Sequence, residues 1–329
     1  MESKLFFNFW EVVETTSFFL YIAIGGRGIG KTYSILDGLC NKQKSQFLYI
    51  RRTEEELKTS TTEGENPFKA INRDFNREIE LVAEGKGYTI IEGETRLGKC
   101  GALSTFGKFR GADFNDIDYI FFDEFISTSP IDHLKKHEAN LFFNLIETVQ
   151  RNREILGKKS IKIILCANSN RLDSGIIKAL ELGEVIRQMK VKKVETWTDE
   201  ERGVFLTLPR DLKITEMKKE TSLYKLTKGT KFYDMSISND FVADTFDDVK
   251  KIQANRLIPI VAFNNIYFYE IKGMNMLYAT KRKTKCQSYN DDTKKAFLRE
   301  YWFYLKIFID GKKIYYSDYN VKLEVLDIA

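Results

Sequence analysis

The chain has 329 residues, of which 43% are hydrophobic and 13% aromatic, a composition that indicates a folded core and excludes intrinsic disorder. The formal net charge of +5 permits a polyanionic partner but does not require one. The longest uncharged stretch, 257–269, is shorter than the roughly 18 residues of a membrane span, and the first residues do not resemble a signal peptide. The four cysteines are scattered and expected to be reduced. We therefore expect a cytoplasmic protein without a membrane partner.

An octapeptide, 25–32, matches the phosphate-loop pattern G-x-x-x-x-G-K-[ST] at every fixed position. An apolar strand-like run, 18–24, precedes it and a predicted helix, 33–44, follows, which is the context that this motif requires and that a chance glycine-rich turn lacks. Lys31 would reach the β- and γ-phosphates, and the Thr32 hydroxyl would ligate Mg²⁺. The predicted site for a nucleoside triphosphate and Mg²⁺ consists of Gly25, Gly26, Arg27, Gly28, Ile29, Gly30, Lys31 and Thr32.

Strand-like and helix-like segments alternate over the first two hundred residues, a pattern typical of an α/β fold with a mostly parallel sheet. A strand is predicted over 46–50 and is followed by Arg51 and Arg52. After a polar surface segment, 53–66, the pattern predicts a helix over 67–78. Short strands are predicted around 88–92 and 100–104.

The next apolar strand, 117–122, ends in two acids, Asp123 and Glu124. Asp123 would hold Mg²⁺ through its water shell, and Glu124 would act as the general base on the attacking water. The alternative is an acidic turn at a strand end, which the phosphate-loop motif disfavours. Because a nucleotide kinase or GTPase would not usually supply Glu124, the pair indicates hydrolysis that drives motion.

Two polar positions follow further along the chain. Asn168 ends the apolar strand 161–168, where it would either contact the γ-phosphate or simply open a turn; the two interpretations are equally supported. Arg151 closes an amphipathic helix, 140–153. Its spacing favours an interaction with the helix dipole over an arginine finger that enters a neighbouring subunit's site.

The character of the sequence changes beyond Pro209, because 210–230 is rich in Lys and Thr and is predicted to be a linker. Aromatic strand-like runs follow, with a hairpin predicted at Gly273 and a helix over 292–305 before the final strands. His133 and His137 have the i, i+4 spacing of a metal pair but no further ligand pattern, so a solvated helix is expected there.

Five segments occur in this order along the chain: 25–32, 49–52, 109–112, 122–126 and 149–154. The two most specific sequences among them are Asp-Glu-Phe-Ile and Arg-Asn-Arg-Glu. In these segments the chain resembles the genome-packaging ATPases of small protein-primed tailed bacteriophages, the podovirus type, which are compact relatives of large terminase subunits.

The resemblance implies an ATP-hydrolysing P-loop domain of the additional-strand catalytic-glutamate type over 1–208, a linker over 209–230 and a smaller α+β domain over 231–329. It implies a homo-oligomeric ring, expected to be a pentamer, that docks on the portal of a procapsid in the host cytoplasm and translocates double-stranded DNA. Some relatives also use a packaging RNA, which makes RNA a candidate partner. The resemblance assigns the arginine-finger role to Arg151 and places Arg27 and Arg110 near the nucleotide.

The carboxy-terminal domain of this family resembles the RNase H-like nuclease of large terminases. Two-metal cleavage needs clustered acids, whereas the first strand of this domain, 259–265, offers Asn264 and Asn265 where an acid would be expected. We therefore expect a degenerate domain without nuclease activity. Two other functions stay open, a nucleotide-dependent assembly switch on nucleic acid and a P-loop ATPase that remodels proteins. Glu124 and Arg151 disfavour a slow switch.

Overall fold

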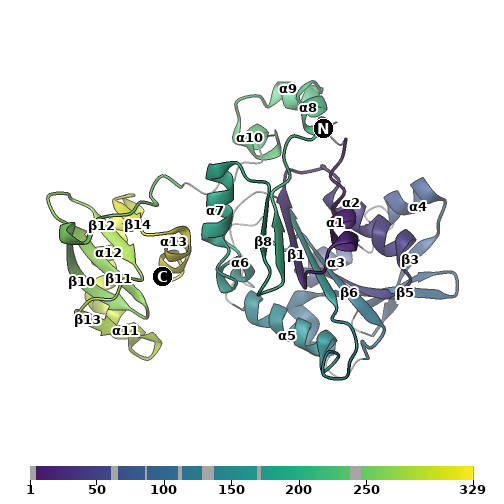
Figure 1. The fold of residues 1–329 in the computed structure, drawn as a ribbon, viewed down its shortest axis with the longest axis horizontal. Helices are drawn as coiled ribbons and strands as arrows, with labels where there is room; N and C mark the ends of the chain where they lie inside the picture. The colour runs from purple at the N-terminus through teal and green to yellow at the C-terminus, as the bar shows by residue number, and fades with distance from the viewer. Residues whose placement is uncertain are drawn as a thin grey trace. The chain divides into compact units, whose positions relative to one another are not determined.

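The computed structural model describes residues 5–60, 66–85, 87–109, 113–127, 137–168, 172–237 and 246–328. The chain divides into two compact units (Figure 1). The first comprises Met1–Ile176 and Lys192–Ala243, and the second comprises Ile177–Val191 and Asp244–Ala329. The second unit therefore takes in a short stretch from the range 1–208, which the sequence assigns to the ATPase domain.

The first unit is built on a sheet that has nine strands in the described part of the chain. The six strands from β5 to β9 are parallel, whereas β3, β4 and β8 are antiparallel to their neighbours. In sheet order the strands are β3 (Ile79–Glu84), β4 (Gly87–Glu92), β5 (Thr95–Ala102), β2 (Gln46–Arg51), β6 (Ile117–Asp123), β7 (Lys162–Asn168), β1 (Leu20–Gly25), β9 (Val204–Thr207) and β8 (Thr196–Asp199). The predicted α/β class with a mostly parallel sheet is confirmed.

Helices cover both faces of this sheet, which explains why its central strands are apolar along nearly their whole length. On one face Trp10, Leu36 and Phe68 pack against Tyr49 and Phe121 in a single buried cluster. On the other face Phe142 of α5 lies 6.3 Å from Phe122, between ring centroids. The covering helices are α1 (Phe9–Thr15), α2 (Lys31–Asp37), α3 (Glu54–Ser60), α4 (Lys69–Phe75) and α5 (Glu138–Gln150).

The helix predicted after the phosphate loop changes from α-helical to π-helical geometry after Asp37. α2 ends at Asp37 and continues as a π-helical turn, Gly38–Lys42. A Cβ atom at Gly38 would lie 1.9 Å from the Trp10 ring, so only a residue without a side chain fits against α1. A short 3₁₀ helix (Leu103–Phe109) also belongs to the first unit, and α6 (Gly175–Ala179) spans the boundary at Ile176 between the two units.

The segment predicted as a linker contains two short helices, α8 (Lys213–Lys219) and α9 (Ser222–Leu226), and α10 (Lys231–Ile237) follows. Leu212 and Tyr224 are buried. The segment also touches the phosphate loop, because a Cβ atom at Gly26 would lie 2.9 Å from the carbonyl oxygen of Ser236. These helices are therefore part of the first unit.

The second unit contains, in its described residues, a five-stranded sheet flanked by helices. Its strands, in sheet order, are β13 (Gln287–Tyr289), β10 (Leu257–Phe263), β11 (Ile266–Ile271), β12 (Leu277–Thr280) and β14 (Ile314–Tyr316). Its helical elements are α7 (Gly183–Lys192, all but its last residue), 3₁₀ turns at Ala254–Arg256 and Asp291–Thr293, α11 (Lys294–Phe297), a π-helical turn (Leu298–Trp302), α12 (Phe303–Asp310) and α13 (Tyr319–Leu326).

Three predictions for this unit can be compared with the structure. The hairpin at Gly273 is confirmed, with φ of +74° at the turn. The helix predicted over 292–305 is confirmed as α11 to α12, and it extends to Asp310. The prediction of final strands is wrong in part, because α13 follows β14; Asp318 caps this helix by accepting a hydrogen bond from the Val321 N–H. Among the described residues no helix has the length and apolar character of a membrane span.

Candidate active site

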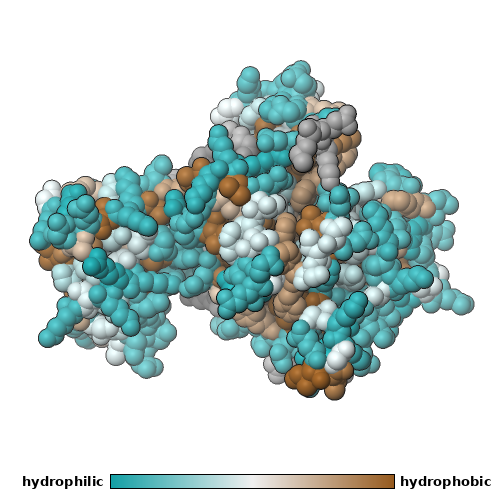
Figure 2. All heavy atoms as spheres, in the orientation of Figure 1, coloured by the Kyte–Doolittle hydropathy of each residue, from teal (hydrophilic) through white to brown (hydrophobic). Residues whose placement is uncertain are grey.

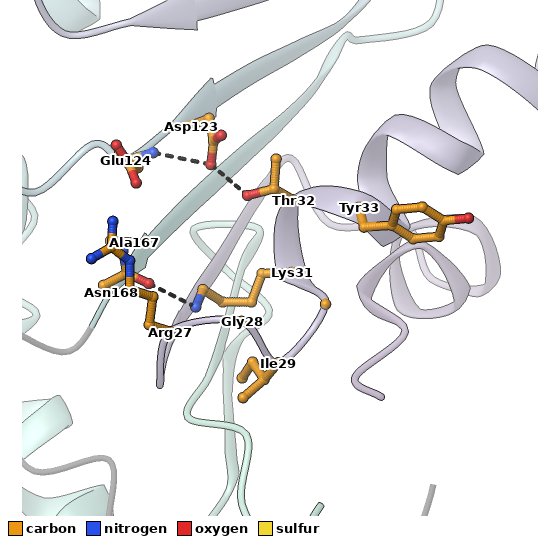
Figure 3. A pocket seen from close by; sticks show the side chains of 11 residues that line it. Arg27, Gly28, Ile29, Lys31, Thr32, Tyr33, Asp123, Glu124, Ala167 and Asn168 are labelled. Atoms are coloured by element: carbon orange, nitrogen blue, oxygen red, sulfur yellow. Dashed lines mark hydrogen bonds between the residues drawn. The ribbon is translucent and has the colours of Figure 1, made fainter. Parts of the chain in front are cut away.

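A pocket of about 270 Å³ opens at the carboxyl ends of β1, β6 and β7 (Figure 3). In parallel sheets this edge is where ligands bind, because the loops and helix N-termini meet there. Most of the nucleotide-site residues predicted from the sequence line this pocket. The lining residues are Arg27, Gly28, Ile29, Gly30, Lys31, Thr32, Tyr33, Asp123, Glu124, Ala167 and Asn168.

The phosphate loop has the curled backbone that anion binding requires. Gly28 and Gly30 have φ of +66° and +102°, conformations that cost glycine little and other residues more. Lys31 is buried, and its ammonium donates to the carbonyls of Gly25 and Gly26 at 3.0 and 2.7 Å. It also donates to Oδ1 of Asn168 at 3.2 Å, since Asn168 pairs with Gly25 in register. The structure thus brings Lys31 and Asn168 together (Figure 3).

The environment of Lys31 predicts a pH dependence. Burial lowers the pKa of Lys31 to about 8. The negative charge of the phosphates favours the protonated form of the Lys31 amine. Above this pKa the amine is mostly neutral in the nucleotide-free protein, so it must take up a proton when nucleotide binds. The affinity for ADP should therefore fall as the pH rises from 7 to 9, by up to about tenfold per pH unit.

Calorimetric titration of ADP across this range measures the effect. Lys31→Met is the control: it should bind more weakly and with a flatter pH profile, because it has no amine to titrate. A wild-type affinity that stays constant from pH 7 to 9 would contradict the prediction.

Thr32 and Asp123, the two residues predicted to hold Mg²⁺, are in direct contact. The Thr32 hydroxyl donates to Oδ1 of Asp123 at 2.9 Å, and the Tyr49 hydroxyl donates to Oδ2 at 3.3 Å. Burial raises the pKa of the Asp123 carboxyl, although the nearby Arg51 opposes the rise. One hydroxyl and one carboxylate fit Mg²⁺, which keeps several waters and takes its remaining ligands from phosphate oxygens.

Glu124, which follows β6, forms an ion pair with Arg51, the last residue of the neighbouring strand β2. Arg51 Nη2 donates to Oε2 of Glu124 at 2.6 Å, and its Nη1 lies 3.5 Å from Oδ2 of Asp123. Glu124 has φ of +52°, and its backbone N–H donates to Oδ1 of Asp123 at 3.1 Å. Sequence reasoning gave Arg51 no role. The signal was its position after an apolar strand, since β2 pairs with β6 and their ends coincide.

A buried ion pair lies beside this site. Arg52 and Glu138 are 2% and 0% exposed, and they contact each other. Arg52 also donates to the carbonyl of Phe125 at 2.8 Å. Glu138 accepts from the Ser174 hydroxyl and the Gly175 N–H at 3.1 and 2.8 Å. Because every charge has a partner, removing one residue of the pair should destabilise the fold by about 3–5 kcal/mol. The pair fixes the first residue of α5.

Arg151 lies outside the pocket of its own chain. It ends α5 as an exposed residue with φ of +44°, and its Nε donates to the Thr148 carbonyl at 3.1 Å. Its neighbour Arg153 is instead bound to the Ile117 carbonyl and the Asp118 carboxylate. Arg110, the other basic residue assigned from the resemblance, lies outside the described residues, as does His133.

Fold and site together define an α/β protein with a large mixed sheet and a phosphate-loop motif at the strand ends. A profile of the podovirus DNA encapsidation protein (Gp16) matches residues 1–297. The chain belongs to this family. The resemblance predicted from five segments is thereby confirmed, and with it the role in packaging a viral genome.

Similar proteins agree with this assignment. The DNA packaging protein of Bacillus phage PZA is 26% identical over 254 residues, which cover 76% of this chain and 70% of that protein. The structure of the bacteriophage phi29 viral genome packaging motor assembly matches with a TM-score of 0.66 and 20% identity, covering 99% of this chain and 98% of that one. The phi28 gp11 DNA packaging motor matches with a TM-score of 0.66 and 19% identity, covering 98% and 96%. At these identities the solved structures support the fold.

Proposed function

We propose that the chain is the ATP-hydrolysing subunit of a ring that drives double-stranded DNA into a procapsid. The observation that carries the proposal is the meeting of Lys31, Thr32, Asp123 and Glu124 in one pocket. The strand order supports the additional-strand catalytic-glutamate type, because β7 lies between β1, which bears the phosphate loop, and β6, which bears the two acids.

The polar residues in and beside the pocket have distinct tasks in this proposal. The loop N–H groups and Lys31 bind the β- and γ-phosphates. Thr32 and Asp123 hold Mg²⁺, which neutralises phosphate charge. Glu124 orients a water and accepts its proton, while Arg51 holds the carboxylate at the lip of the pocket. Asn168, which accepts a hydrogen bond from Lys31, would contact the γ-phosphate.

Arg151 acts in trans in this proposal. It is exposed and absent from the lining of its own pocket, and it begins a turn whose apolar side chains Ile155 and Leu156 are 85% and 72% exposed. Figure 2 shows apolar atoms on the surface near where α5 ends in Figure 1. Adjoining exposed apolar side chains favour a protein contact more than scattered ones do. A neighbouring copy of the chain would cover the turn after α5. Arg151 would then contact the phosphates of the nucleotide bound to that copy.

The partners follow from the relatives. The phi29 structure is described as a viral genome packaging motor assembly, and we extend to this chain a homo-oligomeric ring, with five subunits as the expected number, acting on double-stranded DNA. The proposed partners also include a portal protein and, as a candidate, a packaging RNA. The proposed cofactors are ATP and Mg²⁺. It places the ring in the host cytoplasm, at the procapsid portal vertex during packaging.

Double-stranded DNA should stimulate ATP turnover if this proposal is correct. Steady-state phosphate release is measured with and without linear duplex DNA, under conditions where rings form. A protein-remodelling ATPase would show turnover that duplex DNA does not change. A binding switch would show DNA binding with little turnover.

The second unit, which holds 244–329 of the predicted range 231–329, is proposed to be a degenerate RNase H-like domain. The predicted linker, 209–230, belongs to the first unit. Asn264 and Asn265, expected on the first strand, are the two turn residues between β10 and β11, with φ of +52° at Asn264. Asn at such turns is favoured for its backbone conformation. Lys281, the first residue of a basic run after β12, forms ion pairs with Glu181 and Glu324 at 3.1 and 2.8 Å.

The purified chain should leave linear and supercoiled DNA intact in the presence of Mg²⁺ or Mn²⁺. The reason is that cleavage by two metals needs clustered carboxylates, and no group of three or more metal-ligating side chains is present in the part of the chain that the structure describes. Agarose gels after long incubation provide the measurement. Metal-dependent cleavage that an Asp or Glu substitution within 231–329 removes would overturn this interpretation.

A further inference from the structure

A lysine of the segment predicted as a linker lies against the phosphate loop. The ammonium of Lys218, in α8, donates a hydrogen bond to the carbonyl oxygen of Arg27. It also lies 3.2 Å from the position that a Cβ atom at Gly28 would occupy. Arg27 and Gly28 both line the pocket at the strand ends. Lys218 therefore places a positive charge at the rim of the candidate nucleotide site.

This charge has no carboxylate partner among the described residues. Its described contacts are the Arg27 carbonyl and the face of the Tyr224 ring, 5.9 Å from the ring centroid. The residue is partly buried, and burial lowers the pKa of its amine. Lys218 also adds to the positive potential around Lys31 and opposes the protonation of that amine. Lys31 is balanced by the carboxylates of Asp123 and Glu124, whereas Lys218 has no such partner among the described residues.

The position of Lys218 is fixed by the fold of the segment that carries it. The Ile214 N–H, one turn before Lys218, donates to the Leu5 carbonyl at 3.1 Å. The Phe7 N–H in turn donates to the Ile29 carbonyl in the phosphate loop at 2.9 Å. The backbone preceding α1 therefore connects α8 with the loop, and the approach of Lys218 does not depend on its own side chain alone.

We propose that Lys218 is a further phosphate-binding residue, which pairs with the β- or γ-phosphate of a nucleotide held in the loop. The inference rests on the proposed nucleotide site and adds a residue to it. A charge-assisted hydrogen bond to phosphate is stronger than one to a neutral carbonyl, so the ammonium exchanges the Arg27 oxygen for a phosphate oxygen. Bound nucleotide thereby attaches α8 to the phosphate loop.

Replacing Lys218 with Met tests the proposal, because Met keeps the apolar length of the side chain without the charge. Calorimetry of the full chain should show that Lys218→Met weakens binding of ADP and of a non-hydrolysable ATP analogue by about ten- to a hundredfold. Binding of AMP, which lacks both phosphates, should change little. Lys218→Arg should stay within about threefold of the wild type, because it keeps the charge.

Lys219→Met is the matched control, since the neighbouring Lys219 pairs with Glu216 at 2.6 Å; its nucleotide affinity should equal that of the wild type. If Lys218→Met lowers the unfolding temperature without nucleotide, Lys218→Arg is compared with Lys218→Gln instead. Unchanged ADP affinity in the uncharged variant, or an equal loss for AMP, would overturn the assignment of Lys218. Absence of nucleotide binding by the wild type would instead overturn the proposed function.

Discussion

Glu124→Gln is expected to abolish ATP turnover while leaving ATP affinity close to that of the wild type. The phosphate contacts come from the loop and from Lys31, which this substitution does not touch. Glutamine keeps the size of the side chain but cannot accept a proton, and loss of a general base lowers rates by about 10²–10⁴-fold. Phosphate release and binding of a fluorescent ATP analogue, measured on the same preparation, separate the two effects.

Glu56→Gln provides the matched control for this variant. Glu56 also faces Arg51, with Oε2 at 3.9 Å from its Nε, but it is absent from the pocket lining. Its turnover should stay within a few-fold of the wild type. Undiminished hydrolysis by Glu124→Gln would remove Glu124 from the role of base.

Arg151→Ala should lower turnover by about 10³-fold or more, the contribution typical of arginine fingers, and the defect should be rescued in trans. In a mixture with Glu124→Gln protein, an interface is competent where an intact Arg151 meets an intact Glu124. In a random equimolar mixture this holds for about one quarter of head-to-tail interfaces. ATPase activity of the mixture, measured where rings form, should therefore exceed that of either variant alone.

Two variants in the same turn sharpen this test. Lys158→Ala removes an exposed charge seven residues away and should leave turnover near the wild-type value. Arg151→Gly should be as inactive as Arg151→Ala but at least as stable, because φ of +44° and ψ of −133° suit glycine. If mixing gives no gain although rings form, Arg151 is not a finger.

Most residues of the pocket could be predicted because the strands that carry them are recognisable from short stretches of sequence. Strands β1, β6 and β7 are short apolar runs that each end in a polar or glycine residue, and buried parallel strands have this pattern. The spacing of the loop motif then places Lys31 and Thr32 at the helix start. The apolar runs and the phosphate-loop motif both consist of residues adjacent in the chain, so a single sequence is enough to find them.

The contacts that were not predicted join distant parts of the chain. Arg51 reaches Glu124 only because β2 and β6 pair, and Lys218 contacts a carbonyl 191 positions earlier. The segment around Lys218 is rich in Lys and Thr, which is typical of a linker. Its side chains Leu212 and Tyr224 are nevertheless buried, so the segment packs against the first unit. β3 was not predicted because most of its residues are not buried at the sheet edge.

The buried pair Arg52–Glu138 gives α5 a mechanical property. It ties the first residue of the helix to the backbone one residue beyond Glu124, through the Phe125 carbonyl. With its 13 residues, α5 is a stiff lever about 20 Å long. A tilt of about 5° at the pair displaces the far end by about 2 Å, which separates a formed hydrogen bond from a broken one. A small movement of the acidic strand end would thus be amplified at the end of α5, where Arg151 lies.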